Sequence, residues 1–471
     1  MIALSLAEIA MSTGGRLVDA PTPDTPVSGP VVVDSRQATH GALFVAVRGE
    51  HVDGHDYAPA AVAAGAVGAL ATRPVGVPAI LVDDVVEALG MLARTVVDRL
   101  PDVTVVGVTG SSGKTSTKDL LAHLAGGLGP TVAPVSSYNN EVGHPLTVLR
   151  ADHGTRYLVL EVSARGVGHI ARLCRIAPPH LGVVLNVGTA HMGEFGSREA
   201  IAQAKGELVE ALPEDGVAVL NADDQLVRDM AKRTPARVTL FGRTAEAEVR
   251  AEDVTLDGSG RPRFTLATPE GSAPVALRIF GVHYVTNALA VAAAARQLGT
   301  PVDVVAKKLS EATVPSRWRM EVTERPDGVT VVNDAYNANP ESMRAALESL
   351  ASMGRGRRTW AVLGQMTELG GFSREAHEDL GRLAARLGIA RLVGVGEGVA
   401  PILAGAENQP GWAGEVHRVH SVDAAVSMLR EGLRPGDVVL VKASRVVALE
   451  RIAMALLDDG LDSGLDEGVR A

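Results

Sequence analysis

The sequence predicts an α/β protein with several domains and mainly parallel β-sheets, and three observations support this prediction. The chain has 471 residues, which at about 100–200 residues per domain corresponds to two to four domains. Apolar, β-branched runs alternate with helical patterns over most of the length, as in parallel strands joined by crossover helices. Hydrophobic residues make up 46% of the chain and charged residues 21%. This composition supplies several cores and excludes disordered and collagen-like classes.

The first hundred residues have the pattern of a small α/β domain. Short apolar runs predict strands, and the stretches between and after them predict helices. The strands are expected at 31–34, 43–47 and 79–82, and the helices near 57–71 and 84–100. Pro101 marks the expected end of this domain, which therefore covers residues 1–100.

A second block opens with the run VTVVGVT at 103–109, which is typical of a strand buried on both faces. Further strands are expected at 157–162, 181–187 and 216–220. From 249 to 280 the pattern becomes alternating and polar, which predicts an antiparallel meander, and an Ala-rich helix at 284–298 follows. We expect a central domain at 101–314.

A third block begins near Pro315. Two runs, at 318–322 and 329–334, flank Pro326-Asp327-Gly328, which predicts a β-hairpin. Strand-like runs then alternate with helices, and this alternation is typical of a doubly wound domain at 315–471. Those strands are expected at 358–364, 391–396 and 437–443.

Charge and cysteine content narrow the functional class. The formal net charge is −10, so we expect no nucleic-acid partner, although a local basic cleft can still hold a phosphorylated metabolite. The single cysteine, Cys174, cannot form an internal disulfide, which favours a reducing compartment. The sequence contains no uninterrupted apolar run of about 18 residues, and its start lacks the basic region of a signal peptide. The expected protein is cytoplasmic, without a membrane span.

The strongest motif is a glycine-rich loop between the strand at 103–109 and a helical pattern. Backbone N–H groups and the helix dipole of such a turn face phosphates, a lysine adds a point charge, and a hydroxyl reaches Mg²⁺. Val108 stands where the usual pattern has glycine, and the alternative is a Gly/Ser turn with a surface lysine. We predict nucleotide phosphate binding by Gly110, Ser111, Ser112, Gly113, Lys114, Thr115 and Ser116.

The loop sequence VTGSSGKTSTKD resembles that of the ATP-dependent Mur ligases and their folylpolyglutamate synthase relatives. Further segments agree with this family in order and spacing: 34–57, 136–149, 185–208, 283–294, 333–343, 362–370 and 441–445. The resemblance implies a three-domain architecture. An N-terminal domain would bind a uridine nucleotide, a P-loop-type central domain would bind ATP, and a Rossmann-like C-terminal domain would bind the incoming substrate.

Within the family, AYNANPESM and SYNNEVGHP are most similar to the members that add a dipeptide. The resemblance therefore implies an ATP-dependent ligase that joins D-alanyl-D-alanine to UDP-N-acetylmuramoyl-tripeptide through an acyl phosphate, in cytoplasmic peptidoglycan precursor synthesis. It implies a monomer as well. One alternative is a sister ligase that adds a single amino acid. Another is a non-catalytic, nucleotide-gated binding protein on the same scaffold, but this would not need a second metal site.

The resemblance also assigns catalytic and metal-binding residues, beginning with Lys114 in the loop. Thr115 and Glu161 would hold one Mg²⁺, and His191 would bind a second. Lys205 corresponds to the lysine that Mur ligases carry as a carbamate, and its CO₂ adduct would be an anionic oxygen ligand suited to Mg²⁺. Because only a neutral amine forms a carbamate, the site must lower the pKa of Lys205.

The remaining implied residues bind the substrates. Asn186 and Asn287 would contact adenine, Arg317 the γ-phosphate after domain closure, and Asp334 the ribose. Contacts to the nucleotide sugar, the peptide and the dipeptide are expected from Ser35, Arg36, Asn139, Asn140, Tyr336, Asn337, Asn339, Lys442, Ser444 and Arg445. Gln365 stands where the family often has aspartate, and neither it nor Glu368 is assigned a role.

Overall fold

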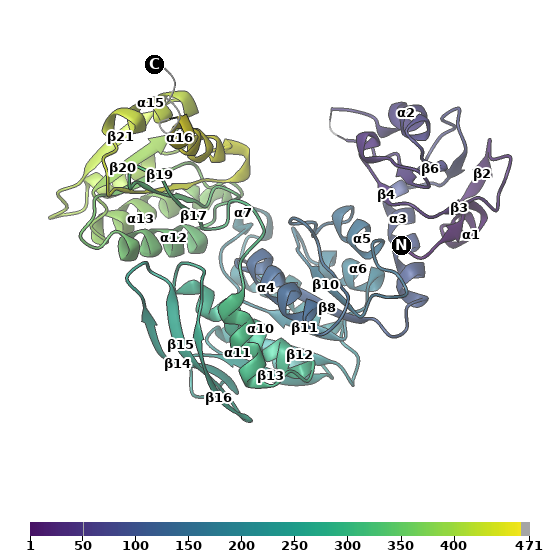
Figure 1. The fold of residues 1–471 in the computed structure, drawn as a ribbon, viewed down its shortest axis with the longest axis horizontal. Coiled ribbons are helices and arrows are strands. Elements are labelled where there is room, and N and C mark those ends of the chain that lie inside the picture. Colours follow the sequence, from purple (N-terminus) through teal and green to yellow (C-terminus); the bar gives the residue numbers. More distant parts are fainter. Residues whose placement is uncertain (50, 463–471) are drawn as a thin grey trace, which may run out of the picture.

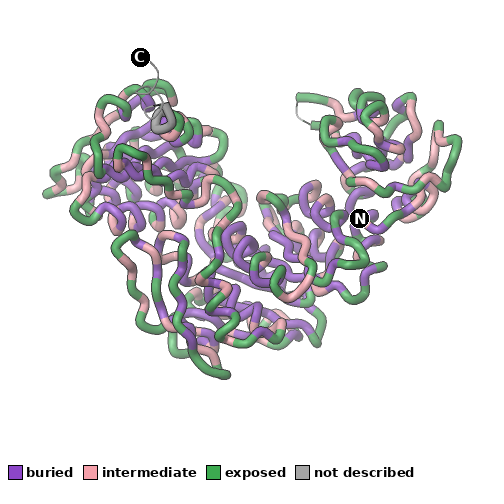
Figure 2. The backbone as a smooth tube through the Cα atoms, in the orientation of Figure 1, coloured by how far each residue is buried: buried purple, intermediate pink, exposed green. Residues whose placement is uncertain are grey.

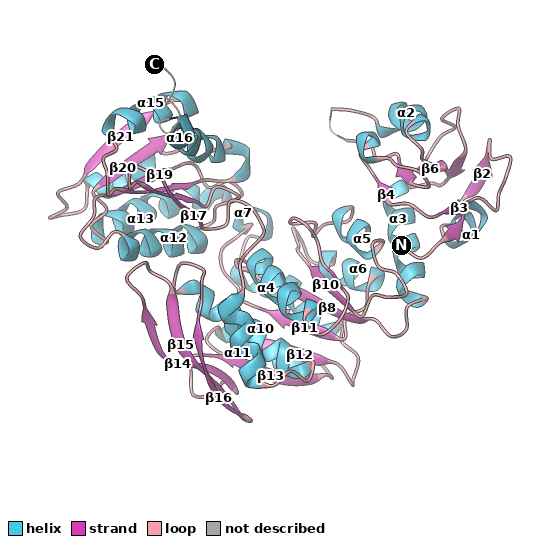
Figure 3. Cartoon of the chain, viewed as in Figure 1, coloured by secondary structure: helices cyan, strands magenta, loops and turns pink. Residues whose placement is uncertain are grey.

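The computed structural model describes residues 1–49 and 51–462, and it arranges three mixed or parallel β-sheets and a short ribbon along the chain (Figure 1). Helices cover the sheets, so that the fold is α/β as predicted (Figure 3). Buried backbone is concentrated along the strands and the inner helices (Figure 2). Within the described residues, no helix is long and apolar enough to cross a membrane.

The N-terminal sheet has five short strands in the order β2-β7-β6-β5-β4. Its bounds are β2 Arg16–Val18, β4 Val31–Val32, β5 Leu43–Val45, β6 Gly68–Ala71 and β7 Ala79–Leu81, with a separate ribbon of β1 Leu4–Ser5 and β3 Pro26–Val27. The helices are α1 Leu6–Ser12, α2 Ala58–Ala63 and α3 Val85–Asp98.

The predicted helix at 57–71 is wrong in its second half, because α2 ends at Ala63 and β6 follows it. Gly65 turns the chain at φ +118° and lies so close to His40 that a Cβ there would approach the backbone N of His40 to 2.9 Å. The residues of β6 are buried between β5 and β7. Tertiary burial in the sheet therefore outweighs the helix propensity of the alanines.

The central sheet has nine strands in the order β16-β15-β14-β13-β12-β11-β8-β10-β9. The parallel strands are β8 Thr104–Thr109, β9 Thr131–Val132, β10 Tyr157–Glu161, β11 Leu181–Val184, β12 Val217–Asn221 and β13 Arg237–Gly242. The predicted meander is confirmed as β14 Val249–Leu256, β15 Pro262–Thr268 and β16 Gly271–Ala276, which pair antiparallel.

Helices pack against this sheet and carry the loops of interest. They are α4 Lys114–Gly126, α5 Gly143–Val148, α6 His169–Ile176, α7 Met192–Phe195, α8 Arg198–Glu210, α9 Gln225–Arg228, α10 His283–Gln297 and α11 Val302–Glu311. The alanines of α10 are almost completely buried. Small side chains allow this helix to lie close to α4, β12 and β13.

The C-terminal sheet has the order β17-β18-β22-β19-β20-β21. Its bounds are β17 Glu321–Glu324, β18 Thr330–Asn333, β19 Thr359–Leu363, β20 Arg391–Val395, β21 Glu415–Val419 and β22 Val438–Lys442. The predicted hairpin is confirmed by the antiparallel pairing of β17 with β18. The helices are α12 Pro340–Met353, α13 Ser373–Arg386, α14 Ala400–Glu407, α15 Val422–Gly432 and α16 Glu450–Asp462.

Polar contacts join the C-terminal part to the glycine-rich loop and its helix. The backbone N–H of Ser316 donates to Asp119 on α4 at 3.2 Å. Asp119 also pairs with Lys118, and both side chains are buried. The Asn339 amide at the start of α12 donates to the Ser111 carbonyl at 3.4 Å. The carboxyl ends of β8, β10 and β11 therefore face the C-terminal part, at the edge where open α/β sheets place ligands.

Candidate active site

The loop between β8 and α4 contains a glycine at a position where a side chain would be strained. Gly113 has φ +83°, and a Cβ at this position would lie 2.6 Å from Oδ1 of Asn287. The Lys114 ammonium donates to the Gly110 carbonyl at 2.8 Å. Burial lowers the pKa of Lys114, and the nearby Glu161 carboxylate opposes this shift. The loop thus has the strand–turn–helix context that a phosphate-binding motif requires.

Asn186 holds this loop in place. Its Oδ1 accepts from the backbone N–H groups of Ser111 (3.0 Å) and Ser112 (2.9 Å), and its Nδ2 donates to the Ser112 carbonyl at 3.1 Å. The side-chain amide is therefore engaged at both ends by the loop. Asn186 also lines the cavity that contains Asn287 and Asp334, so its predicted contact with adenine stays a prediction.

A buried carboxylate lies beside the loop hydroxyl. Glu161 ends β10 and is 1% exposed. Its Oε2 accepts from Thr115 Oγ1 at 2.9 Å and its Oε1 from Asn139 Nδ2 at 2.6 Å. Within residues 1–49 and 51–462, no lysine or arginine forms an ion pair with it. Burying a carboxylate is costly, and the two hydrogen bonds and the nearby Lys114 charge offset part of that cost. An oxygen donor set of this kind suits a hard cation such as Mg²⁺.

His191 lies at the edge of the same site, next to two carboxylates. It has φ +61°, and its Nδ1 lies 2.9 Å from Glu368 Oε2 and 3.7 Å from Glu194 Oε2. The three side chains form a group that could hold a metal ion. The His191 ring beside it holds the pKa of Glu368 below its ordinary value. Glu368 lies in the C-terminal part, between β19 and α13, and the sequence alone offered no reason to assign it a role.

Lys205 lies on α8 and is 4% exposed. Burial and, to a lesser degree, the neighbouring Lys114 charge lower its pKa well below the ordinary value for lysine. Among the described residues no hydrogen bond or ion pair involves its ammonium group. The lowered pKa increases the share of the neutral amine, which is the form that reacts with CO₂.

The arginine that reaches the loop is Arg319. Its Nη2 donates to Thr115 Oγ1 at 3.1 Å and to Ser137 Oγ at 3.3 Å, and its guanidinium stacks over the Tyr336 ring at 4.0 Å. The predicted residue, Arg317, is exposed and lines neither site cavity. The assignment of Arg317 to the γ-phosphate stays a prediction, and Arg319 is the arginine that contacts the loop in this structure. Trp318 turns the chain between them at φ +61°.

A cavity of about 300 Å³ opens behind the loop. Its wall includes Asn287 and Asp334, as expected for a nucleoside site. Lys442 also lines it, but its ammonium pairs with Asp334 at 2.7 Å and donates to the Asn337 carbonyl at 2.9 Å. Burial lowers the pKa of Lys442. Lys442 thus has an internal partner in this structure, and its predicted contact with substrate stays a prediction.

A second cavity, of about 390 Å³, lies in front of the loop and joins the central and C-terminal parts. It brings together most of the predicted catalytic residues. Its wall includes Ser111, Ser112, Gly113, Lys114, Thr115, Ser116, Asn139, Glu161, His191, Arg319, Tyr336, Asn337, Asn339, Glu368 and Arg445. Arg445 also pairs with Glu450 at 2.7 Å.

Other predicted contacts lie outside both cavities. Asn140 is exposed, and its Oδ1 accepts from the Gly143 N–H at the start of α5. Ser444 is buried and accepts from the Thr367 N–H at 2.9 Å. These two residues make local hydrogen bonds, and their predicted contacts with substrate stay predictions. Arg36 pairs with Asp34 on the N-terminal part, and Ser35 precedes it there.

Comparison with known protein families shows to which family the chain belongs. Three family models match the chain: the Mur ligase family, catalytic domain at 30–96, the Mur ligase middle domain at 108–295, and the Mur ligase, glutamate ligase domain at 318–445. The chain belongs to the Mur ligase family. The matched segments contain the loop at 110–116, Glu161, His191 and Arg319.

Similar Mur ligases cover the chain almost end to end. It is 49% identical to the UDP-N-acetylmuramoyl-tripeptide–D-alanyl-D-alanine ligase of Mycobacterium bovis over 98% of both chains. It is 35% identical to the protein of that name from Escherichia coli K12, with 98% of this chain and 100% of the relative covered.

Among solved structures, a MurF structure from Acinetobacter baumannii has a TM-score of 0.87 at 30% identity, covering 97% of this chain and 99% of that one. The MurF ligase of Thermotoga maritima in complex with ADP has a TM-score of 0.79 at 31% identity, covering 93% and 99%. The three-domain Mur ligase architecture predicted from the sequence is confirmed by these similarities.

The position of Arg319 generates a prediction for nucleotide binding by this Mur ligase. Replacing Arg319 with alanine should weaken binding of a non-hydrolysable ATP analogue about 10- to 100-fold, because a lost hydrogen bond to a charged group costs about 1.5–3 kcal/mol. The matched variant Arg317→Ala should change affinity by no more than about twofold, as for an exposed surface residue. Isothermal titration calorimetry measures both, and the reverse order of effects would restore the original assignment.

Proposed function

We propose that this Mur ligase joins D-alanyl-D-alanine to UDP-N-acetylmuramoyl-tripeptide, in cytoplasmic peptidoglycan precursor synthesis, with ATP as phosphoryl donor. The observation that carries the proposal is the 49% identity, over 98% of both chains, to a relative named for that reaction. The cleft around the glycine-rich loop supports it, because the residues expected for phosphoryl transfer converge there. The tripeptide carboxylate would be phosphorylated first, and the dipeptide amine would then attack the acyl phosphate.

The chain's own cations act on the triphosphate. Backbone N–H groups at 110–116 and the N-terminus of α4 would bind the phosphate oxygens. Lys114 lies at the start of α4, and Arg319 reaches the same place from the C-terminal part. Such preorganised charges stabilise a phosphoryl group in transfer, because they need no rearrangement as its charge shifts. Asn287 and Asp334 would contact the nucleoside in the cavity behind the loop.

Thr115 and Glu161 are the residues that would hold a first Mg²⁺, and His191 with Lys205 a second. The buried Glu161 carboxylate and the Thr115 hydroxyl 2.9 Å from it provide hard oxygen donors. Bound Mg²⁺ would neutralise phosphate charge. We further propose that Lys205 becomes carbamylated. Its burial and lowered pKa support this proposal, since a neutral amine is the reactive form.

The substrate residues extend the proposal across the chain. Asn139, Tyr336, Asn337, Asn339 and Arg445 line the front cavity, where the tripeptide carboxylate and the dipeptide must meet. Ser35 and Arg36 would bind the uridine diphosphate on the N-terminal part. We accordingly propose residues 1–100 as the uridine-nucleotide domain, 101–314 as the ATP domain and 315–471 as the dipeptide domain.

The decisive assay compares amines. With ATP and UDP-N-acetylmuramoyl-tripeptide, phosphate release should depend on D-alanyl-D-alanine, and free L-lysine or D-glutamate should give background rates only. Lys114→Ala should reduce the rate at least about 100-fold, because it removes a preorganised charge from the reacting phosphates. Lys307→Ala, at an exposed position on α11, is the matched control. Equal rates with single amino acids would favour a sister ligase, and no amine-dependent release would favour a binding protein.

Carbamylation of Lys205 predicts a specific spectroscopic signal. After equilibration with ¹³C-bicarbonate, the wild-type protein should show a carbamate resonance that Lys205→Ala lacks. The same variant should lose most of its activity and recover part of it in acetate or formate, because a small carboxylate can replace the missing oxygen ligand. Unchanged turnover of Lys205→Ala, with no carbamate resonance in the wild type, would contradict the proposal.

A further inference from the structure

The loop at 186–193 contacts the glycine-rich loop, the start of α9 and the C-terminal part. At its start, Asn186 braces the glycine-rich loop, and the Gly188 N–H donates to Ser111 Oγ at 2.9 Å. The Val187 N–H donates to Asp224 at 2.7 Å, which ties the loop to the start of α9. His191 lies further along the loop. A displacement of this loop would therefore move the candidate metal ligand and the phosphate loop together.

Two carboxylates of the C-terminal part hold the second half of this loop. Glu341, in the first turn of α12, accepts from the Thr189 N–H at 2.7 Å and from its hydroxyl at 2.9 Å. Glu368 places its side chain 2.9 Å from Nδ1 of His191, and its backbone carbonyl accepts from the Gly193 N–H at 3.0 Å. Gly193 also touches Gly370 so closely that a Cβ on either glycine would clash with the other.

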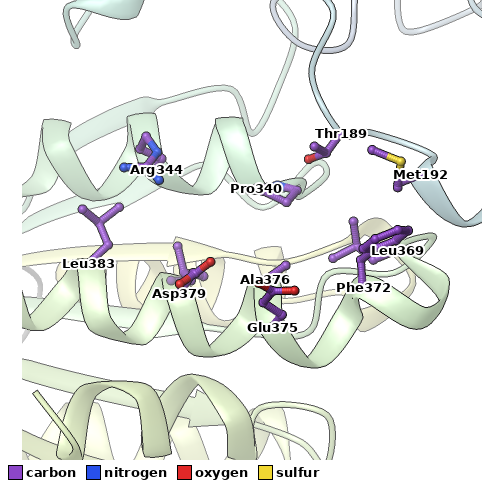
Figure 4. A pocket seen from close by; sticks show the side chains of 11 residues that line it. Thr189, Met192, Pro340, Arg344, Leu369, Phe372, Glu375, Ala376, Asp379 and Leu383 are labelled. Carbon is purple, nitrogen blue, oxygen red and sulfur yellow. The ribbon is translucent and has the colours of Figure 1, made fainter. Parts of the chain in front are cut away.

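Apolar packing between this loop and the helices α12 and α13 is incomplete. A cavity of about 210 Å³ lies between the loop, α12 and α13. Figure 4 shows Thr189 and Met192 facing Leu369 and Phe372 across this space. The polar contacts of Glu341 and Glu368, together with the close approach of Gly193 to Gly370, therefore join the loop that carries His191 to the C-terminal part.

The contact with Glu368 determines which ring nitrogen of His191 can bind a metal ion. A neutral histidine binds a metal ion through its unprotonated ring nitrogen, and a carboxylate at the other nitrogen fixes the tautomer and the ring orientation. Glu368 at 2.9 Å and Glu194 at 3.7 Å both lie on the Nδ1 side of the ring as ion-pair contacts, and neither is aligned as a hydrogen bond. Within the part of the chain that the structure describes, no hydrogen bond or ion pair involves its Nε2. Nε2 is therefore the ring atom left for a cation.

We propose that Glu368 is a positioning residue for His191. Its carboxylate keeps the proton on Nδ1 and presents Nε2 to a divalent cation, and it does so only while the C-terminal part is docked on the loop. This inference rests on the proposed function for the identity of the cation, and it adds a physical link between docking and completion of the metal site. The backbone at both residues supports it, since His191 (φ +61°) and Glu368 (φ +68°) adopt the left-handed conformation that clusters at functional sites.

Manganese binding tests this proposal without requiring ligase activity. The full chain, saturated with a non-hydrolysable ATP analogue, is titrated with Mn²⁺ and free Mn²⁺ is measured by electron paramagnetic resonance. Glu368→Ala should weaken the weaker Mn²⁺ site about 10- to 100-fold, as is typical when a carboxylate behind a metal-binding histidine is lost. Glu368→Gln, which keeps an acceptor oxygen, should have a smaller effect. Affinity for the ATP analogue itself should stay unchanged.

Glu375→Gln is the matched control, because Glu375 is an exposed carboxylate of α13 that, among the described residues, has no hydrogen bond or ion pair to the loop or to His191. In turnover assays, Glu368→Gln should raise the Mg²⁺ concentration for half-maximal rate while the KM for the tripeptide stays constant. If Glu368→Gln and Glu375→Gln bind Mn²⁺ equally well, the proposal is overturned, even where Glu368→Ala fails to fold. A failed amine assay with a normal Mn²⁺ shift would instead contradict the proposed function alone.

Discussion

Electrostatic repulsion between a triphosphate and a carboxylate is the main physical constraint on this site, because the two anions must be brought together. Two unit charges 4 Å apart interact by about 4 kcal/mol at an effective dielectric of 20, and several phosphate charges face each incoming carboxylate. The chain as a whole is acidic, at −10, so its positive charge must be concentrated locally. Lys114, Arg319 and Arg445 line the front cavity. The carboxylates of Glu161 and Glu368 line it as well, where they can interact with cations.

The site is assembled from parts that are distant in sequence. The central part contributes the loop at 110–116 and the buried carboxylate of Glu161. The C-terminal part contributes Arg319, which contacts Thr115, and Glu368, which contacts His191. Neither part alone carries the full charge arrangement. The contacts between the two parts therefore complete the charge arrangement as well as the fold.

The sequence predicted the local features well, because they depend on neighbouring residues. A strand, a glycine turn and a helix start follow one another in the printed order, so the loop at 110–116 could be identified directly. The choice between Arg317 and Arg319 could not, since it depends on the left-handed turn at Trp318. The sequence also could not show the internal hydrogen bonds and ion pair of Asn186, Lys442 and Ser444, because their partners are brought close only by folding. Glu368 was missed because its partner is distant in sequence.

A crystal structure with a non-hydrolysable ATP analogue and Mg²⁺ tests the central claim most directly. The account predicts the triphosphate within hydrogen-bonding distance of the backbone N–H groups at 110–116, with electron density for an ion in contact with both Thr115 and Glu161. A triphosphate bound away from this loop, or phosphates at the loop with no ion beside Glu161, would contradict it.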